Sequence, residues 1–291
     1  MASTLVLRRQ IKSITGTKKV TKAMELVSGS KMRKSVSAVL AARPYSQEIL
    51  DLVYHLHTEG TSLFSLLQDR EIKRAVFVVI SSNRGLCGGF NTALGTSTSK
   101  AYIAEKEQGS KQVDVITVGK KVRDYFLRSG IKPVADFAKS DITRSARETL
   151  GLAKILSDWY EQKKVDKVVL VYTHFVSSVK QQIVHKQLLP FSINGSSTNG
   201  NGHDKHGVSS YEPSREELFH FLLPRCLEIQ LYQALLESEA SEHSARMMAM
   251  HNASKAANEM LDDLRLTYNQ VRQTAITQEM AEISSAMTTI M

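Results

Sequence analysis

Four features of the sequence involve residue types that could do chemistry. The first is the glycine-rich turn 85–91, Gly-Leu-Cys-Gly-Gly-Phe-Asn, which follows an apolar run and could offer backbone N–H groups to a phosphate. It matches neither the G-x-x-x-x-G-K-S/T loop nor the G-x-G-x-x-G fingerprint of nucleotide-binding proteins. Glycines in this position are typical of a tight turn from a strand to a helix. The sequence therefore favours a structural turn over a nucleotide site.

The other three features give weaker signals. The sequence Val-Gly-Lys-Lys at 118–121 lacks the upstream glycine of a phosphate-binding loop. His203 and His206 have a spacing that metal ligands can use, but no second pair of ligands accompanies them. Cys87 has no evident histidine partner that would activate its thiol. We therefore expect no catalytic residue, no cofactor and no metal ion in this chain.

The centre of the chain alternates between short apolar runs and helical stretches. Buried strands are predicted at 74–81, 113–118 and 167–172. Helices are predicted between them, at about 91–108, 120–129 and 141–163. This alternation is typical of a mostly parallel sheet with helices packed on it, so we expect an α/β domain over about 73–192. The Gly/Asn/Ser-rich composition of 194–208 predicts a flexible loop after it.

A long helix is predicted at each end of the chain. From Arg225 to Met291 there are 67 residues without glycine or proline, although the whole chain has 15 Gly and 5 Pro. Because glycine costs about 1 kcal/mol and proline about 3 kcal/mol inside a helix, this run predicts one helix on the order of 100 Å long. Residues 3–56 predict a second helix, with a kink or break near Pro44. Pro224 predicts a bend, and Ser214 is the expected N-cap of the C-terminal helix.

The two terminal helices are expected to pair with each other. The apolar stripe of the C-terminal helix is thin, which suits one partner helix better than a bundle. Gly29, Ala253 and Ala257 would let the two backbones approach closely. We therefore predict an antiparallel coiled coil of the terminal helices beside the α/β domain. The expected parts are an N-terminal shaft helix at 1–56, a globular domain at 57–213 and a C-terminal shaft helix at 214–291.

The charge of the chain is unevenly distributed. Residues 1–43 hold ten Lys or Arg and one acid, whereas residues 215–291 hold six Lys or Arg and eleven Asp or Glu. Their surplus of nine positive charges equals the net charge of the whole chain, +9. A basic arm could bind nucleic acid, although it has no aromatic residue before Tyr45. A coiled-coil scaffold and a freestanding α/β enzyme with helical arms are the other classes that the residues alone leave open.

The remaining composition indicates a chain without membrane or disulfide features. Two cysteines in 291 residues suit a reducing compartment. No apolar run approaches the length of about 18 residues that a transmembrane helix requires. The first residues also lack the apolar stretch of a signal peptide.

Four segments resemble the gamma subunit of F-type ATP synthases. The longest is 11–34, which begins Ile-Lys-Ser-Ile-Thr-Gly and ends Lys-Met-Arg-Lys. Segments 241–258 and 272–283 resemble the C-terminal helix of that family, with Ala-Arg-Met-Met-Ala-Met in the former and Ile-Thr-Gln-Glu-Met in the latter. The turn 84–91, Arg-Gly-Leu-Cys-Gly-Gly-Phe-Asn, also matches. The resemblance extends over essentially the whole chain, with 194–208 as a local insertion.

This resemblance implies a rotor without chemistry of its own. The terminal helices would form an asymmetric shaft inside a ring of three alpha and three beta subunits, with one gamma. The α/β domain would lie outside the ring, against the epsilon subunit and the c-ring, and no nucleic acid would be a partner. Rotation of the ion-driven c-ring would thereby be coupled to ATP synthesis or hydrolysis. The implied location is the cytoplasmic face of a bacterial plasma membrane, reached peripherally through the complex, with an organellar inner membrane as the alternative.

The resemblance also assigns individual contacts. Two groups of residues match positions that contact the beta subunit, namely Arg272, Gln273, Thr277 and Glu279, and Lys31, Arg33 and Lys34 near Met24. The second group would face an acidic C-terminal loop of that subunit. Tyr211 and Glu212 match the segment that docks on the c-ring. For the basic group a solvated helix face is the alternative, and for Met24 the alternative is packing within the helix pair.

Overall fold

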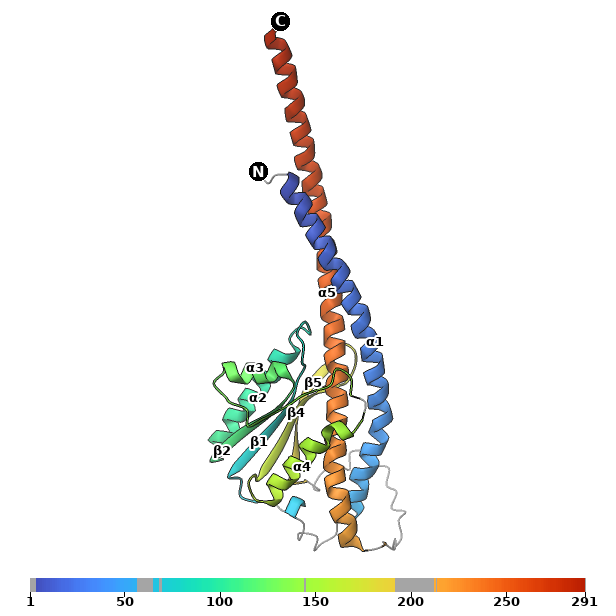
Figure 1. Cartoon of the computed structure of the whole chain (residues 1–291), viewed down its shortest axis with the longest axis vertical. Helices are drawn as coiled ribbons and strands as arrows, with labels where there is room; N and C mark the ends of the chain where they lie inside the picture. The colour runs from blue at the N-terminus through green and yellow to red at the C-terminus, as the bar shows by residue number, and fades with distance from the viewer. Residues whose placement is uncertain are drawn as a thin grey trace. The chain divides into compact units, whose positions relative to one another are not determined.

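The computed structural model describes residues 4–56, 65–67, 70–143, 145–191, 212 and 214–290. Helix α1 (Thr4–Leu56) and helix α5 (Arg215–Ile290) bracket the described part of the chain, as Figure 1 shows. The chain divides into two compact units, one of Met1–Gly29 with Arg246–Met291 and the other of Ser30–Ala245. The three predicted parts, 1–56, 57–213 and 214–291, remain a prediction, because residues 57 and 213 lie outside the described part.

The larger unit contains a five-stranded sheet in the order β3-β2-β1-β4-β5. Its strands are β1 (Arg74–Ile80), β2 (Gln112–Val118), β3 (Ala135–Phe137), β4 (Lys167–Phe175) and β5 (Gln181–Leu189). All neighbouring pairs are parallel except β4 and β5, which form an antiparallel hairpin. The mostly parallel sheet is confirmed. Strands β1, β2 and β4 were predicted, whereas β3 and β5 were not.

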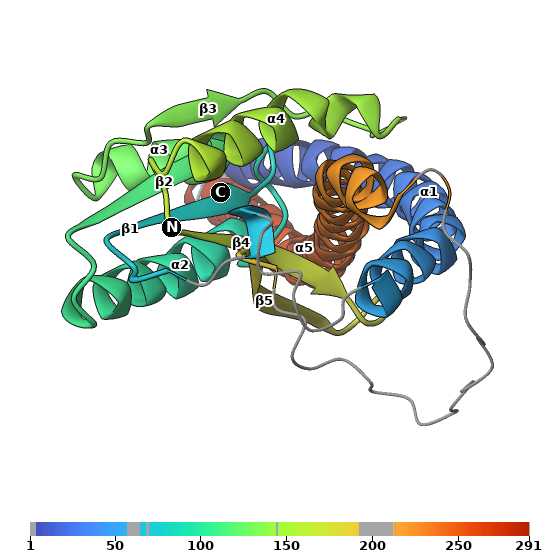
Figure 2. The ribbon, with the colours of Figure 1, turned by 90° about the horizontal axis from the view of Figure 1, so that it is seen from below.

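Helices cover both faces of this sheet because successive side chains of a strand point to opposite sides. Ala75, Phe77 and Val79 pack against α2 (Phe90–Glu107) and α3 (Lys120–Arg128). Val76, Val78 and Ile80 pack against α4 (Arg147–Glu161), α5 and the end of α1. Figure 2 shows α2 and α4 on opposite sides of the strands. Since both faces are covered, β1 is apolar over nearly its whole length, as its sequence predicted.

Both long helices continue through their prolines. Helix α1 contains Pro44 and helix α5 contains Pro224, so the break that Pro44 predicted does not occur. Buried side chains on both sides of Pro44, among them Val39 and Ile49, hold the helix to its neighbours. This packing outweighs the hydrogen bond that proline removes. At the start of α5 the backbone N–H of Glu217 donates to Ser214 Oγ at 3.2 Å, which confirms the predicted N-cap.

Helix α4 begins later than predicted. The sequence predicted helix from residue 141, but α4 begins at Arg147. Instead, residues 138–143 and 145–146 belong to a connection between β3 and α4, which makes polar contacts with α1 and α5. The backbone N–H of Thr143, for example, donates to Glu239 of α5 at 2.8 Å.

The terminal helices run antiparallel within each unit. In the smaller unit, Arg8 Nη2 donates to Tyr268 Oη at 2.8 Å, and Ser254 Oγ donates to Thr21 Oγ1 at 2.8 Å. The partner number falls as the α1 number rises, which is the antiparallel order that the sequence predicted. In the larger unit, Val39 packs against Leu236 and Ala240. Of the small residues expected in this interface, Gly29 and Ala257 are buried and Ala253 is half-buried.

Candidate interaction site

Helix α5 occupies the edge of the sheet where α/β proteins usually bind ligands. In such sheets the ligand lies outside the carboxyl ends of the strands. Here Ser238 Oγ donates to the carbonyl of Ile80, the last residue of β1, at 3.4 Å. Ser241 Oγ donates to the carbonyl of Thr173, near the end of β4, at 3.1 Å. The carbonyls that close these strands are therefore bound by serines of the chain itself.

Two buried glutamates of α5 attach the connection between β3 and α4. Glu242 forms an ion pair with Lys139 at 2.8 Å, and the lysine side chain is only 1% exposed. Glu239 accepts hydrogen bonds from Thr143 N at 2.8 Å and from Ser35 Oγ of α1 at 2.6 Å. A buried carboxylate must be paired or hydrogen-bonded to be tolerated, and both glutamates satisfy this requirement. Together they join α1, α5 and the connection after β3.

A third glutamate of α5, Glu237, joins two further elements. Its carboxylate contacts His174 Nδ1 of β4 and accepts a hydrogen bond from Gln233 Nε2 at 2.8 Å. Arg43 of α1 lies 3.6 Å away through its Nε atom. Burial raises the pKa of Tyr172 well above its ordinary value, and the nearby Glu237 carboxylate adds to this rise. These groups form a structural polar cluster between the sheet and the long helices.

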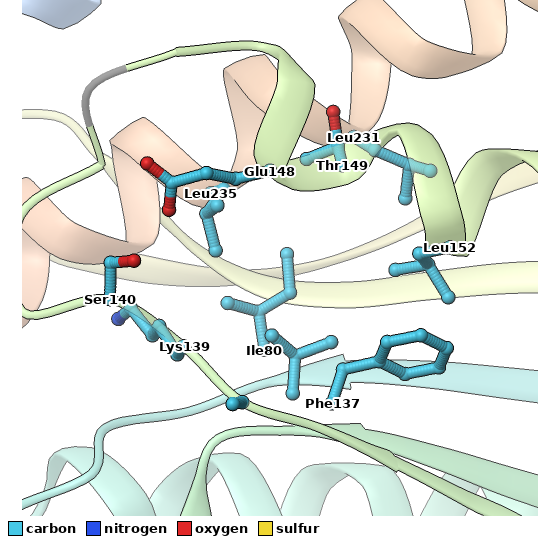
Figure 3. A pocket seen from close by; sticks show the side chains of 11 residues that line it. Ile80, Phe137, Lys139, Ser140, Glu148, Thr149, Leu152, Leu231 and Leu235 are labelled. Carbon is cyan, nitrogen blue, oxygen red and sulfur yellow. The ribbon is translucent and has the colours of Figure 1, made fainter.

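A small cavity lies beside this anchored region. It has a volume of about 40 Å³ and is lined by Ile80, Val118, Phe137, Leu152, Leu231 and Leu235 with a few polar residues (Figure 3). This volume has room for a few water molecules. The Lys139 amine, which could otherwise bind a ligand here, is paired with Glu242. No group of three His, Cys, Asp or Glu side chains in the described part of the chain could hold a metal ion.

The glycine-rich turn is bonded within itself. Ser82 Oγ donates to the carbonyl of Arg84 at 2.7 Å, and Asn91 Nδ2 donates to Cys87 Sγ at 3.1 Å. Leu86 and Gly88 have φ values of 62° and 57°, which fold the chain tightly before α2. Cys87 is only 2% exposed, so its thiol is not presented to a substrate. These contacts support the structural interpretation of the turn.

The basic residues predicted to contact a partner lie on α1. Lys31 is half-buried, whereas Arg33 and Lys34 are exposed. The Lys31 amine lies 3.9 Å from Oδ2 of Asp141, and the same oxygen lies 2.8 Å from Arg84 Nη2. The structure thereby brings Arg84 from the glycine-rich turn beside Lys31, which the sequence did not predict. We name Lys31, Arg33, Lys34 and Arg84 the basic patch.

The second predicted group lies near the C-terminal end of α5. Arg272, Gln273, Thr277 and Glu279 are all exposed. Thr277 Oγ1 donates to the carbonyl of Gln273 at 2.9 Å, one turn earlier in the same helix. Met24 belongs to the same unit and is half-buried. We name residues 269–284 of α5 the α5 tip.

The α5 tip also exposes an apolar stripe, which extends the thin stripe predicted for the C-terminal helix. Ile276, Met280 and Ile283 are 48%, 66% and 60% exposed, respectively, and follow one another at intervals of four and three residues. This spacing places them on one face of the helix. The signal was present in the sequence, but only the exposures show that the described part of α1 does not cover this face.

Several predicted positions lie outside the described part of the chain. They are Tyr211, the loop 194–208 and the two histidines within it, His203 and His206. Glu212 is described and is exposed. Among the described helices, none has the length and apolar character needed to cross a membrane.

Fold and site together define a class of protein. It is an α/β domain whose would-be ligand edge is bound by its own C-terminal helix, with long antiparallel helices that carry exposed polar and apolar side chains. A family model for ATP synthase matches residues 3–290. The chain is 40% identical to the ATP synthase gamma chain of Herpetosiphon aurantiacus, over 100% of this chain and 99% of the relative. It is 36% identical to that of Legionella pneumophila strain Corby, over 97% and 98%. The chain belongs to the ATP synthase gamma chain family.

Solved structures share the fold. The rotor of the Euglena gracilis mitochondrial ATP synthase matches with a TM-score of 0.65 at 16% identity, over 94% of this chain and 98% of that chain. The central stalk and c-ring structure of the Tetrahymena thermophila enzyme matches with a TM-score of 0.60 at 23% identity, over 81% and 99%. At these identities the likeness concerns the fold.

Proposed function

We propose that this chain is the central rotor shaft of an F-type ATP synthase. In this role it couples ion-driven rotation of a c-ring to ATP synthesis or hydrolysis at sites formed by alpha and beta subunits. The observation that carries the proposal is membership of the gamma chain family over nearly the whole chain. The exposed α5 tip supports it, because apolar side chains on one bare face favour enclosure by a partner.

In its proposed role the chain acts through contacts with the alpha and beta subunits and has no catalytic residues. A shaft that drives three identical sites through different states must present a different surface to each of them. Coupling between shaft orientation and nucleotide affinity is then reciprocal, so rotation changes binding and binding changes rotation. Ser238 and Ser241 support the non-catalytic role, since they bind carbonyls at the carboxyl ends of β1 and β4.

The proposed beta-subunit contacts are of two kinds. Arg272, Gln273, Thr277 and Glu279 offer exposed polar groups for hydrogen bonds and ion pairs at the α5 tip. The basic patch, with Met24 nearby in the sequence, would meet an acidic loop of the beta subunit by electrostatic attraction. Tyr211 and Glu212 are the proposed contact with the c-ring.

The proposed assembly contains three alpha and three beta subunits for each copy of this chain, with an epsilon subunit and the c-ring. The chain would reach the cytoplasmic face of a bacterial plasma membrane peripherally, through these partners. The bacterial origin of the relatives supports this location over an organellar membrane. The nucleic-acid-binding and scaffold alternatives receive no support from the family membership.

Reconstitution tests the proposal. The purified chain alone should hydrolyse no ATP, whereas mixing it with alpha and beta subunits should give a complex of three, three and one with sustained turnover. The control is the alpha–beta mixture without this chain, and composition is read by native mass spectrometry. Failure to assemble in this ratio would overturn the proposal.

A further inference from the structure

Asp141 places a carboxylate between two cations of the basic patch. Its Oδ2 atom lies 2.8 Å from Arg84 Nη2 and 3.9 Å from Lys31 Nζ. The Asp141 side chain is 44% exposed and that of Arg84 is 74% exposed, so water reaches the cluster. Ion pairs this exposed contribute little to the stability of a fold. The position of Asp141 therefore calls for a reason other than stability.

Buried contacts fix the position of the connection that carries Asp141. On one side of it, Lys139 is paired with Glu242 and its carbonyl accepts a hydrogen bond from Asn83 Nδ2 at 2.6 Å. On the other side, Thr143 N donates to Glu239. These contacts hold the connection whether or not Asp141 pairs with a cation. The carboxylate is thus presented to Lys31 and Arg84 by the fold.

The charge of the patch follows from this placement. Lys31, Arg33, Lys34 and Arg84 carry four positive charges, and Asp141 reduces the sum to three. An arriving carboxylate would meet a cluster that already holds one of its own kind. To pair fully with Lys31 and Arg84, that carboxylate must displace Asp141 or share the two cations with it. Either outcome weakens the attraction between the basic patch and the arriving carboxylate. This effect of Asp141 becomes smaller as salt is added, because the charged groups are exposed to solvent.

We propose that Asp141 is an internal competitor for the acidic segment that binds the basic patch. This inference rests on the proposed function, in which the acidic segment belongs to the beta subunit. The chemistry of the partner follows from the group that already occupies the site, which is a carboxylate on a short side chain. A contact weakened in this way can form and release as the shaft turns, whereas Lys31 and Arg84 without Asp141 between them would hold an acidic loop more tightly.

Peptide binding to the full-length chain tests this inference. The probe is a short fluorescein-labelled peptide rich in Asp and Glu, followed by fluorescence anisotropy at low salt. Asp141→Asn should bind it roughly threefold more tightly than the wild type, with the ratio approaching one as salt is raised to about 0.5 M. The matched control is Asp262→Asn, which removes an exposed acid paired with Arg265 at 3.5 Å in the other unit.

The outcomes separate the inference from the function on which it rests. Equal affinities for Asp141→Asn and Asp262→Asn, with binding still dependent on Lys31 and Arg84, would overturn the role of Asp141 alone. Binding that the double variant Lys31→Gln/Arg84→Gln leaves unchanged would overturn the acidic contact of the basic patch, and the competitor with it. Thermal melting of each variant, expected within 1–2 °C of the wild type because surface changes have small effects, confirms that the fold is retained.

Discussion

Single residues of the larger unit show how charge is accommodated between the sheet and the long helices. Glu237, Glu239 and Glu242 all have hydrogen-bond or ion-pair partners, so their burial is compensated. The charge of Lys186, in β5, is less well compensated. Burial lowers the pKa of its amine, and the nearby Cys226 and Glu237 only partly oppose this effect. The charged form of Lys186 therefore costs stability in the folded state.

Replacement of Lys186 by methionine should stabilise the chain at neutral pH. The folded pKa of this lysine is below its unfolded value, so its penalty is present at neutral pH and disappears as pH rises toward about 10.5. Lys186→Met should therefore raise the free energy of unfolding by ~1 kcal/mol at pH 7, with a gain that shrinks at higher pH. Urea denaturation followed by circular dichroism across this range gives the measurement. Glu237 keeps Arg43, His174 and Gln233 as partners in the variant. A variant less stable than the wild type at pH 7 would contradict the prediction.

At the scale of elements, close packing between helices decides which glycines are required. Gly95 lies in α2 where α3 crosses it, and a Cβ atom there would lie 2.7 Å from the ring of Tyr125. Gly16 lies in α1, and a Cβ atom there would meet nothing within 4 Å. The two glycines are alike in secondary structure and differ in their surroundings. Only the first is needed for packing.

Alanine at these two positions should have opposite effects. Gly95→Ala should destabilise the chain by about 1–3 kcal/mol, because the Tyr125 ring must move out of a packed site. Gly16→Ala should stabilise α1 by about 0.5–1 kcal/mol, because alanine loses less backbone entropy in a helix. Thermal and urea denaturation of both variants provide the comparison, with each serving as the control for the other. A stabilising Gly95→Ala would show that the ring moves without cost.

At the scale of the whole molecule, the proposed role depends on side chains of the α5 tip that are exposed to solvent. The α5 tip combines exposed polar residues with the stripe of Ile276, Met280 and Ile283. Stability of the isolated chain should therefore be insensitive to changes at the tip. Function in a complex should be sensitive to them.

The double variant Arg272→Ala/Gln273→Ala tests this difference. ATP hydrolysis by the reconstituted complex should fall roughly fivefold, as expected when ~1 kcal/mol of transition-state stabilisation is lost. The matched control is Arg265→Ala/Asn258→Ala, which removes one arginine and one carboxamide from exposed positions of the same helix outside the α5 tip. The isolated chains of the double variant and of the control should unfold at the same temperature. Unchanged turnover in the first variant would exclude the proposed beta-subunit contact.

Much of the fold could be predicted because it depends on local patterns. Strands β1, β2 and β4 are nearly continuous apolar runs, and the absence of glycine and proline after Pro224 predicted most of α5. Strand β5 could not be found in this way, since Gln181–Leu189 is a polar edge strand whose exposed residues, Gln182, His185 and Gln187, do not follow a regular alternation. Strand β3 has only three residues, too few for a recognisable pattern.

The site was harder to predict because its contacts join distant residues. Arg84 and Lys31 are separated by 53 positions, and only the connection carrying Asp141 brings them together. The residues of the α5 tip were found through resemblance to a family, since exposed polar side chains on a helix have no distinctive pattern. Ser238 and Ser241 would be read from sequence as ordinary polar residues of a helix. Their roles follow from the backbone carbonyls that lie opposite them in the fold, those of Ile80 and Thr173.

The serines that bind the sheet restrict how the length of α5 can change. Ser238, Ser241 and Ser244 donate to carbonyls of Ile80, Thr173 and Ser178, which belong to different parts of the sheet and its hairpin. Each residue of an α-helix turns it by about 100°, so inserting or deleting one residue just before Ser238 would direct all three hydroxyls elsewhere. Homologous chains should therefore keep the spacing between these serines and the start of α5, and should accommodate insertions and deletions elsewhere.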